Sequence, residues 1–335
     1  MSRMDQVKRE GEWGYVMRAI IFDHELRYIE NWPVPTLKAG WALIRVSLAG
    51  ICKTDLEILK GYMGFRGVLG HEFLGIVTAC EERSWIGKRV TGEINAACGH
   101  CDWCARGLGR HCPNRTTLGI DKLDGCMAEF CILPMENLCP IDASIEDERA
   151  VLIEPLSAAC EILEQLPLHG SERIVVLGDG RLGILCAWVL STVASDVTLV
   201  GHHPEKLDVA RWRTIRVVDR EDGVIPGADV VVEATGSGRG IALAMSLCRP
   251  RGVLVLKSTV ALQGEVNLAP IVVHELTVIG SRCGRFADGM AVMMEFPDMP
   301  LQRLITDRLP LSSALEAFRR AQDGLSLKVL LDMDL

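Results

Sequence analysis

The chain has 335 residues, more than one hydrophobic core usually supports, so we expect two domains. Hydrophobic residues make up 49% of the chain, which excludes intrinsic disorder, and the net charge of −8 argues against nucleic acid or an anionic membrane as a partner. The apolar run at residues 182–194 is too short to span a bilayer, and residues 1–16 lack the apolar core of a secretory signal. We therefore expect a cytoplasmic globular protein.

The N-terminal part of the chain predicts a compact, mostly β domain. Residues 17–22 have the composition of a first strand, so residues 1–16 are expected to form a loosely held extension. Further short strands are predicted at 41–48 and 73–78, divided by Gly, Pro and charged turns. We place this domain at residues 17–154.

A cysteine and a histidine of this domain, Cys52 and His71, each lie near a carboxylate and between glycines. Thiolate sulfur and imidazole nitrogen are preferred zinc ligands, and carboxylates such as Asp55 and Glu72 orient such ligands or join them. The sequence leaves two candidates for the third ligand, Glu72 and Glu154. An open zinc site could bind an alcohol oxygen and act as a Lewis acid. In the alternative, Cys52 is a buried core thiol and His71 a core imidazole.

Four further cysteines are separated by two, two and seven residues. This spacing matches a tetrahedral zinc site with four thiolates and no open position, which would be structural. An iron–sulfur cluster uses similar spacings, and four ordinary thiols are the remaining alternative. Without a secretory signal, the thirteen cysteines favour metal binding in a reducing cytoplasm over disulfides. The predicted ligands are Cys98, Cys101, Cys104 and Cys112.

After about residue 155, predicted strands and helices alternate. We therefore expect a doubly wound α/β domain with a parallel sheet over residues 155–283. The remaining residues, 284–335, return to an amphipathic helix at 312–323 and a final strand at 327–331. The predicted strands of the α/β domain are 173–177, 197–200, 230–232, 252–256 and 276–279.

Three glycines, Gly178, Gly180 and Gly183, stand between the first of these strands and a helix, as the dinucleotide-binding fingerprint requires. Gly178 permits the tight turn, Gly180 lets the backbone approach the pyrophosphate, and Gly183 allows close packing of helix on strand. The pyrophosphate then faces the helix N-terminus. The loop therefore predicts a nicotinamide cofactor.

The residues after the next strand favour NADP(H) over NAD(H). An NAD-binding chain usually carries Asp or Glu about twenty residues beyond the glycine loop, whereas this chain has Gly201. Glycine removes the carboxylate that would repel a 2′-phosphate, and possible hydrogen-bond donors follow. In the alternative, Glu205 or Asp208 reaches the ribose. The predicted phosphate-binding segment contains Gly201, His202, His203 and Lys206, with Arg211 as a further donor.

Taken together, the motifs resemble those of zinc-dependent alcohol dehydrogenases of the medium-chain dehydrogenase/reductase superfamily, over nearly all of residues 17–335. The resemblance implies a GroES-like catalytic domain, a Rossmann NAD(P)-binding domain and a C-terminal segment that rejoins the first domain. It also implies that Glu154 matches the glutamate ligand of the polyol and sugar branch. The motifs are Gly50-Ile51-Cys52-x-Thr54-Asp55, Gly70-His71-Glu72, the four-cysteine segment, Glu154-Pro155-Leu156 and Gly178-x-Gly180-x-x-Gly183.

The same resemblance assigns groups around the reaction. The hydroxyl matching Thr54 would hydrogen-bond the substrate alcohol and start a proton relay. Glu57 stands where the liver-type enzymes have a relay histidine, so this segment is more similar to glucose dehydrogenases. Lys53 and Lys328 fall where the family places basic residues near the pyrophosphate, and Thr235, at a strand end, could line the cofactor.

We therefore expect reversible oxidation of a secondary alcohol, polyol- or sugar-like, with NADP⁺ as hydride acceptor. The enzyme would hold one catalytic and one structural zinc and form a homodimer or homotetramer. One alternative is a ketone reductase of a biosynthetic pathway, and another is a member that prefers NAD(H). A third, from another class, is a non-catalytic sensor that binds NADPH.

Overall fold

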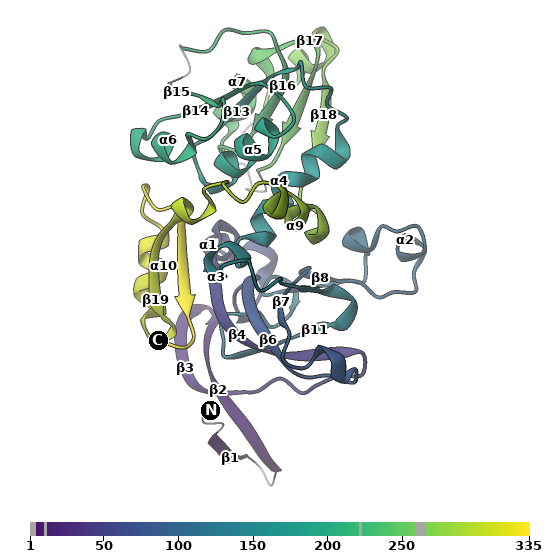
Figure 1. Ribbon diagram of the computed structural model, residues 1–335, viewed down its shortest axis with the longest axis vertical. Helices are drawn as coiled ribbons and strands as arrows, with labels where there is room; N and C mark the ends of the chain where they lie inside the picture. Colours follow the sequence, from purple (N-terminus) through teal and green to yellow (C-terminus); the bar gives the residue numbers. More distant parts are fainter. Residues whose placement is uncertain (1–4, 10–11, 221–222, 259–265) are drawn as a thin grey trace. The chain divides into compact units, whose positions relative to one another are not determined.

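The computed structural model describes residues 5–9, 12–220, 223–258 and 266–335 (Figure 1). These residues divide into two compact units. Unit 1 contains the chain up to Ile153 together with the C-terminal segment Ile305–Leu335, and unit 2 contains Glu154–Leu304. The second unit is therefore inserted within the sequence of the first.

The predicted boundary at residue 284 differs from this division, which falls after Leu304. Helix α9 (Phe286–Glu295) accounts for the difference, because its Gly289 packs against Ser157 of helix α4 (Ile153–Gln165). A Cβ at Gly289 would lie 3.1 Å from the Ser157 backbone nitrogen. The segment that contains α9 therefore belongs with unit 2.

The main sheet of unit 1 has the strand order β12-β7-β6-β4-β20-β19, with β11 paired to β4. Strand β4 (Trp41–Ile51) alternates buried and half-buried residues along most of its length, as the sequence pattern predicted. Strand β20 (Lys328–Asp332), the last of the chain, pairs antiparallel with β4 and parallel with β19 (Ile305–Pro310). Strand β20 thus lies in the interior of the sheet, between β4 and β19.

Two smaller sheets and several short helices complete the described part of unit 1. One sheet has the order β1-β2-β3 with β5 paired to β2, and the other has the order β10-β9-β8. The other strands are β1 (Asp5–Arg9), β2 (Glu12–Asp23), β3 (Glu25–Pro33), β5 (Gly67–Val68), β6 (Glu72–Ala79), β7 (Arg89–Gly92), β8 (Asn95–Ala96), β9 (Thr116–Leu118), β10 (Lys122–Leu123), β11 (Phe130–Pro134) and β12 (Leu138–Pro140). The helices are α1 (Lys53–Ile58), α2 (Asp102–Ala105), α3 (Asp147–Ala150) and α10 (Ala314–Ala321), with 3-10 turns η1 (Tyr62–Gly64), η2 (Arg83–Trp85), η3 (Gly109–His111), η4 (Met135–Asn137) and η7 (Leu311–Ser313).

The first predicted strand is longer than the sequence pattern indicated. Strand β2 begins at Glu12 rather than near residue 17, and it pairs antiparallel with β1. Part of the predicted loose extension is therefore hydrogen-bonded sheet. Residues 1–4 and 10–11 of that extension lie outside the described residues.

Unit 2 contains a fully parallel sheet, with the strand order β15-β14-β13-β16-β17-β18 in the residues that are described. From β13 (Arg173–Leu177), strands β14 and β15 extend the sheet to one edge, and strands β16, β17 and β18 extend it to the other. This is the doubly wound order predicted from the sequence, and it places a topological switch point between β13 and β16 (Ala228–Glu233). Ligands of such sheets bind beyond the carboxyl ends of the strands at this point.

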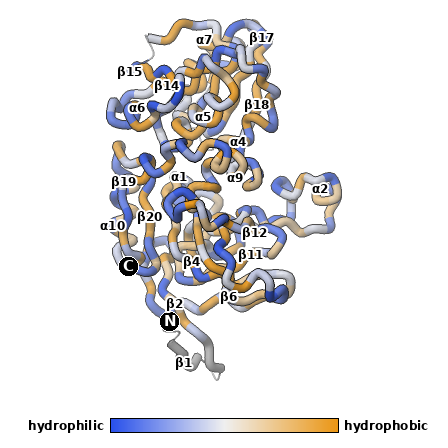
Figure 2. Tube along the Cα trace, in the orientation of Figure 1, coloured by the Kyte–Doolittle hydropathy of each residue, from blue (hydrophilic) through white to orange (hydrophobic). Residues whose placement is uncertain are grey.

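Apolar residues dominate the centre of unit 2 (Figure 2). Helix α5 (Arg181–Ser191) is buried from Gly183 to Ser191 and contacts β13, β14 and β16. No helix of the described residues is both long and apolar enough to cross a membrane. The other elements are β14 (Asp196–Gly201), β15 (Arg216–Asp219), β17 (Cys248–Leu256), β18 (Thr277–Gly280), α6 (Pro204–Ala210), α7 (Gly238–Leu247), α8 (Ala269–Val273) and the 3-10 helix η6 (Leu301–Leu304).

Candidate functional site

Unit 1 brings together three metal-ligating side chains. Cys52 precedes helix α1, and His71 and Glu72 lie at the start of β6. One ligand atom from each residue lies within 4.8 Å of the others. His71 and Glu72 are buried and Cys52 is half-buried, so the group is accessible from one side only. The pairing of β4 with β6 joins these distant parts of the sequence, since Gly50 is the register partner of Glu72.

Asp55 holds two members of this group in place. Its Oδ2 accepts a hydrogen bond of 2.7 Å from the Cys52 backbone N–H, and its Oδ1 lies 3.4 Å from His71 Nδ1. The carboxylate is fully buried. A carboxylate behind one ring nitrogen fixes the histidine orientation and leaves the other nitrogen, Nε2, for a metal.

The charges of the cluster affect the His71 imidazole. Burial acts to lower the pKa of His71, but the Asp55 carboxylate and the Cys52 sulfur outweigh burial and raise that pKa well above its ordinary value. A metal ion would replace the proton that this arrangement favours. The donor set of sulfur, imidazole nitrogen and carboxylate oxygen, with its supporting carboxylate, fits zinc.

The sequence did not predict the environment of Glu72. The Lys328 ammonium forms an ion pair with Glu72 Oε2 and donates a hydrogen bond of 3.1 Å to the Ile51 carbonyl. Both charged side chains have an exposed fraction of 0%. Lys328 was expected near the cofactor pyrophosphate, and the structure places it beside a proposed metal ligand. A lysine directly before the apolar residues Val329–Leu331 was the available sign of a buried partner.

The predicted proton-relay residues lie on helix α1. Thr54 Oγ1 is 3.7 Å from Cys52 Sγ, so the hydroxyl lies beside the metal-ligating group. Glu57 is one turn further along and forms an ion pair of 2.9 Å with Lys60. Lys53 is exposed at the start of the helix. Glu154 is the first residue of unit 2 and is buried at the start of α4, and its place among the zinc ligands stays a prediction.

The four clustered cysteines converge as their spacing predicted. Their sulfur–sulfur distances are 3.5 Å for Cys101–Cys104 and Cys98–Cys112, 3.7 Å for Cys101–Cys112 and 3.9 Å for Cys98–Cys104. Zn–S bonds of about 2.3 Å in a tetrahedron would separate the sulfurs by about 3.8 Å. The arrangement therefore fits a closed four-thiolate zinc site.

Two of these thiols differ in acidity. Hydrogen bonding from the His100 backbone lowers the pKa of Cys98 to about 6, whereas burial raises the pKa of Cys104 to about 11. Because thiolates are the ligating form, metal binding here would release protons from the less acidic members.

In unit 2 the glycine loop has the close packing of a dinucleotide fingerprint. Gly178 adopts φ +111°, and a Cβ there would lie 2.8 Å from the Ala234 carbonyl oxygen beyond the end of β16. Gly180 is the N-cap of α5, and nothing lies within 4 Å of a Cβ built on it. A Cβ at Gly183 would collide with the Gly178 carbonyl. The loop can therefore take a pyrophosphate at the N-terminus of α5.

The premise behind the predicted NADP(H) preference was wrong. A carboxylate does lie at the end of β14, because Asp179 of the glycine loop reaches over Gly201. Asp179 Oδ2 accepts hydrogen bonds from the backbone N–H groups of His202 (2.7 Å) and His203 (2.8 Å). The sequence contained a signal for this contact, which was an acidic residue between the first two glycines of the loop together with a glycine at the end of the next strand.

The other predicted cofactor residues are also engaged within unit 2. Lys206 is buried, and Arg211 forms an ion pair of 3.7 Å with Asp208. The Thr235 hydroxyl donates to Glu233 Oε1 at 2.5 Å, and the Thr235 backbone N–H donates to the same oxygen at 2.7 Å. Thr235 is thus positioned just beyond β16, at the carboxyl edge of the sheet.

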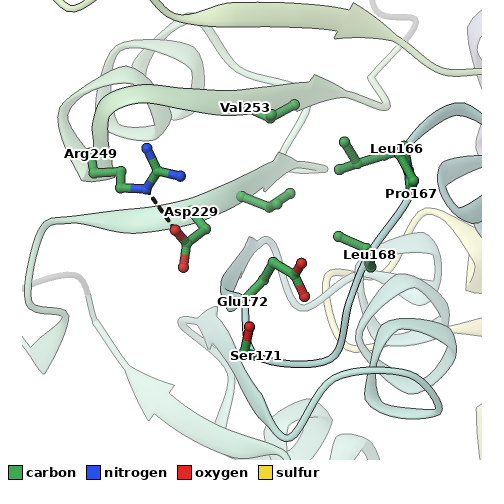
Figure 3. A pocket seen from close by; sticks show the side chains of 9 residues that line it. Leu166, Pro167, Leu168, Ser171, Glu172, Asp229, Arg249 and Val253 are labelled. Atoms are coloured by element: carbon green, nitrogen blue, oxygen red, sulfur yellow. Dashed lines mark hydrogen bonds and ion pairs between the residues drawn. The ribbon is translucent and has the colours of Figure 1, made fainter.

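A pocket of about 320 Å³ lies at the opposite edge of this sheet (Figure 3). Asp229 and Arg249 form an ion pair of 2.6 Å on one side of it, with Leu166 and Leu168 on the other. These residues lie at the amino ends of β13, β16 and β17, away from the carboxyl edge where ligands of such sheets bind. We therefore assign the pocket no part in the candidate site.

Two protein-family models match the chain. A family model described as an alcohol dehydrogenase GroES-like domain matches residues 38–143. A second, described as the glucose dehydrogenase C-terminus, matches residues 147–333, more than half of the chain.

Individual relatives match this chain over most of their own length. A sorbitol dehydrogenase of Halalkalibacterium halodurans is 26% identical over 90% of this chain and 94% of its own. An L-threonine 3-dehydrogenase of Rhizobium etli is 28% identical over 91% of this chain and 94% of its own. The solved structure of an alcohol dehydrogenase from Escherichia coli CFT073, complexed with NADH, is 26% identical with a TM-score of 0.86, covering 95% of this chain and 99% of that one.

Proposed function

The chain belongs to the zinc-dependent alcohol dehydrogenase-like family of the medium-chain dehydrogenase/reductase superfamily, and we propose that its substrate is a polyol- or sugar-like secondary alcohol. The enzyme is an NAD(P)-dependent oxidoreductase that acts on CH–OH donors. The reaction is the reversible conversion of the alcohol to the corresponding ketone. The predictions of family, fold class and enzyme class from the sequence are thereby confirmed.

One observation carries the proposed chemistry: Cys52, His71 and Glu72 present ligand atoms within 4.8 Å of one another, with Asp55 behind the histidine. A sorbitol dehydrogenase among the relatives and the glutamate at residue 154 support the polyol or sugar class. A carboxylate-containing zinc shell is expected of that branch, and both Glu72 and Glu154 remain proposed ligands.

The chain's own residues have distinct tasks in this mechanism. Zinc held by Cys52, His71 and a glutamate would supply Lewis acidity that makes the substrate alcohol more acidic. The Thr54 hydroxyl, beside Cys52, accepts a hydrogen bond from the alcohol and relays the proton by donating its own proton onward. Asp55 keeps His71 oriented while this happens. Glu57 shares a face of α1 with Thr54 and is the proposed next proton acceptor.

The cofactor is a nicotinamide dinucleotide bound at the loop of Gly178, Gly180 and Gly183. NADP(H) was the preferred form on the sequence alone. That preference has weaker support once Asp179 is considered, because its carboxylate takes the place beside Gly201 that was expected to be uncharged.

A substrate panel tests the function. Polyols, sugars and simple secondary alcohols would be offered with NAD⁺ and NADP⁺, and the matching ketones with NADH and NADPH, while absorbance of the reduced nicotinamide is followed. We expect kcat/KM to be highest for a polyol or sugar. If only ketones react at useful rates, the enzyme is a reductase. The polyol or sugar class would be wrong if simple alcohols were preferred.

The Cys52→Ser variant separates the enzyme from a non-catalytic NADPH sensor. It should lose one zinc per chain and nearly all turnover while keeping the four-cysteine zinc. A matched control is Cys80→Ser, a half-buried thiol of the same unit that belongs to neither cluster. Loss of zinc without loss of turnover would contradict the proposed mechanism.

We further propose a homodimer or homotetramer in a reducing compartment, the cytoplasm. Strand β18 forms an edge of the parallel sheet, and Val272 and Val273 of the preceding helix are 78% and 73% exposed. Such an apolar edge is suited to a second copy. The four clustered cysteines are proposed to bind zinc as thiolates, which suits reducing conditions. Light scattering after gel filtration would measure the assembly.

A further inference from the structure

The most informative feature outside the metal cluster is the contact between the glycine loop and the end of β14. Asp179 lies in the loop after β13, and Gly201 is the last residue of β14. A Cβ added to Gly201 would lie 2.6 Å from Asp179 Cγ and still closer to its carboxylate oxygen. No side chain fits at residue 201 while Asp179 occupies this space.

The Asp179 carboxylate is held by several donors. In addition to the two backbone N–H groups, His203 Nδ1 lies 2.9 Å from Oδ2 and 3.1 Å from Oδ1. Burial raises the pKa of the Asp179 carboxyl, but the hydrogen bonds from His202 and His203 outweigh burial and lower that pKa below its ordinary value. The group is therefore a fixed negative charge near neutral pH.

This carboxylate still has capacity to bind a ligand. An ionised carboxylate has about four acceptor positions, and the donors from His202 and His203 lie mainly at Oδ2. Oδ1, with one longer contact, retains a free lone pair. A ribose hydroxyl can donate to such an oxygen, whereas a phosphate oxygen cannot and would be repelled.

The surroundings do not reverse the sign of this charge. The His203 ring is bound to Asp179, Arg211 is paired with Asp208, and Lys206 is buried. Strand β15, the neighbour of β14, ends with Asp219 in register with Gly201, and Arg220 follows. Both side chains are exposed, and the Arg220 backbone N–H donates a hydrogen bond of 3.0 Å to the Gly201 carbonyl.

We propose that Asp179, a residue of the glycine loop, recognises the adenosine ribose. This role is usually played by an acidic residue at the end of β14. This specificity rests on the proposed use of a nicotinamide dinucleotide, and it favours the unphosphorylated 2′-hydroxyl of NAD(H) over the 2′-phosphate of NADP(H). Glycine at residue 201 leaves the space that the Asp179 side chain occupies.

Direct binding measurements test the assignment without any turnover. Isothermal titration of the zinc-loaded protein with NAD⁺ and with NADP⁺ gives the two dissociation constants. Wild type should bind NAD⁺ about tenfold or more tightly than NADP⁺. Asp179→Asn should weaken NAD⁺ binding about tenfold, because one charged hydrogen bond to the ribose is lost. It should also abolish or reverse the preference for NAD⁺ over NADP⁺, because the repulsion of the 2′-phosphate is removed. Asp196→Asn, an exposed acid at the other end of β14, is the matched control and should change neither constant.

A double variant that moves the carboxylate from residue 179 to residue 201 tests the assignment even if Asp179→Asn does not fold. Gly201→Asp alone should bind neither nucleotide well, because it collides with Asp179. The double variant Asp179→Ala/Gly201→Asp restores the usual arrangement and should recover NAD⁺ binding and the ratio.

The outcomes separate this assignment from the cofactor proposal. Three results would overturn the role of Asp179 while leaving the dehydrogenase function intact. They are a wild-type preference for NADP⁺, an equal loss of affinity for both nucleotides in Asp179→Asn, and an unchanged ratio of the two dissociation constants in that variant. Failure of wild type to bind either nucleotide overturns both.

Discussion

At the scale of single residues, the buried carboxylate of Asp55 should control metal affinity. Asp55→Asn keeps the shape but weakens the interaction with His71 Nδ1, so we expect zinc affinity at the Cys52–His71 site to fall about 10- to 100-fold. Competition with a chromophoric chelator measures this. Asp334→Asn, an acid with a 64% exposed side chain, should leave the affinity unchanged, and an unchanged Asp55→Asn would contradict the assigned role.

The ion pair of Glu72 with Lys328 makes a second prediction at this scale. Lys328→Met leaves a buried carboxylate without its cation, and we expect the free energy of unfolding to fall by about 3–5 kcal/mol. Urea denaturation of the zinc-free protein, in which no metal ion shares the Glu72 carboxylate, measures the change. Glu72→Gln/Lys328→Met should regain much of the loss, while Lys60→Met, with a 70% exposed side chain, should cost little. A change below about 1 kcal/mol for Lys328→Met would contradict this interpretation.

Residues whose partners are close in sequence were predictable, and residues whose partners are distant were not. Cys98, Cys101 and Cys104 lie within one loop, so their spacing alone predicted their convergence. The contact of Lys328 with Glu72 depends on β20 pairing beside β4, which no local pattern specifies. The Asp179 carboxylate was missed because only the folded sheet places the loop after β13 above the end of β14.

At the scale of elements, strand β20 should contribute strongly to unit 1. Leu330 is fully buried, and Leu330→Ala should lower the free energy of unfolding by about 2–5 kcal/mol through lost burial and a residual cavity. Leu335→Ala, at a position that is 67% exposed, is the control and should change it little. Chemical denaturation monitored by circular dichroism compares them, and equal effects would show that β20 does not hold the sheet together.

Most of the elements that periodicity predicted lie within a few residues of elements in the structure. The last predicted strand, 327–331, corresponds to β20 (Lys328–Asp332), and the last predicted helix, 312–323, contains α10 (Ala314–Ala321). Strand β1 was missed because its residues Asp5–Arg9 are mostly charged or polar, and only pairing with β2 makes them a strand.

At the scale of the whole molecule, the two units should respond to different ligands. NAD⁺ at about 100 times its dissociation constant should stabilise unit 2 by about 2.7 kcal/mol, and removal of zinc should destabilise unit 1. Differential scanning calorimetry with and without each ligand measures both effects. A single transition that shifts equally with either ligand would contradict separate stability of the units.

Alternating strands and helices were sufficient to predict the second unit, since a parallel sheet follows directly from that alternation. The extent of the unit was harder to predict, because the sequence of α9 (Phe286–Glu295) does not indicate which unit its apolar residues pack against. Its partner, Ser157, lies far back in the sequence.

The position of β20 has a consequence for biosynthesis. Domains generally begin to fold as they leave the ribosome, and here the inserted unit emerges whole before the outer unit can close. A nascent chain already displays Cys52, His71 and Glu72 before Lys328, which follows Glu72 by 256 residues, has been synthesised. Maturation of the proposed metal centre therefore waits for synthesis of β20, and a chain truncated before β20 would leave the Glu72 carboxylate without its cation.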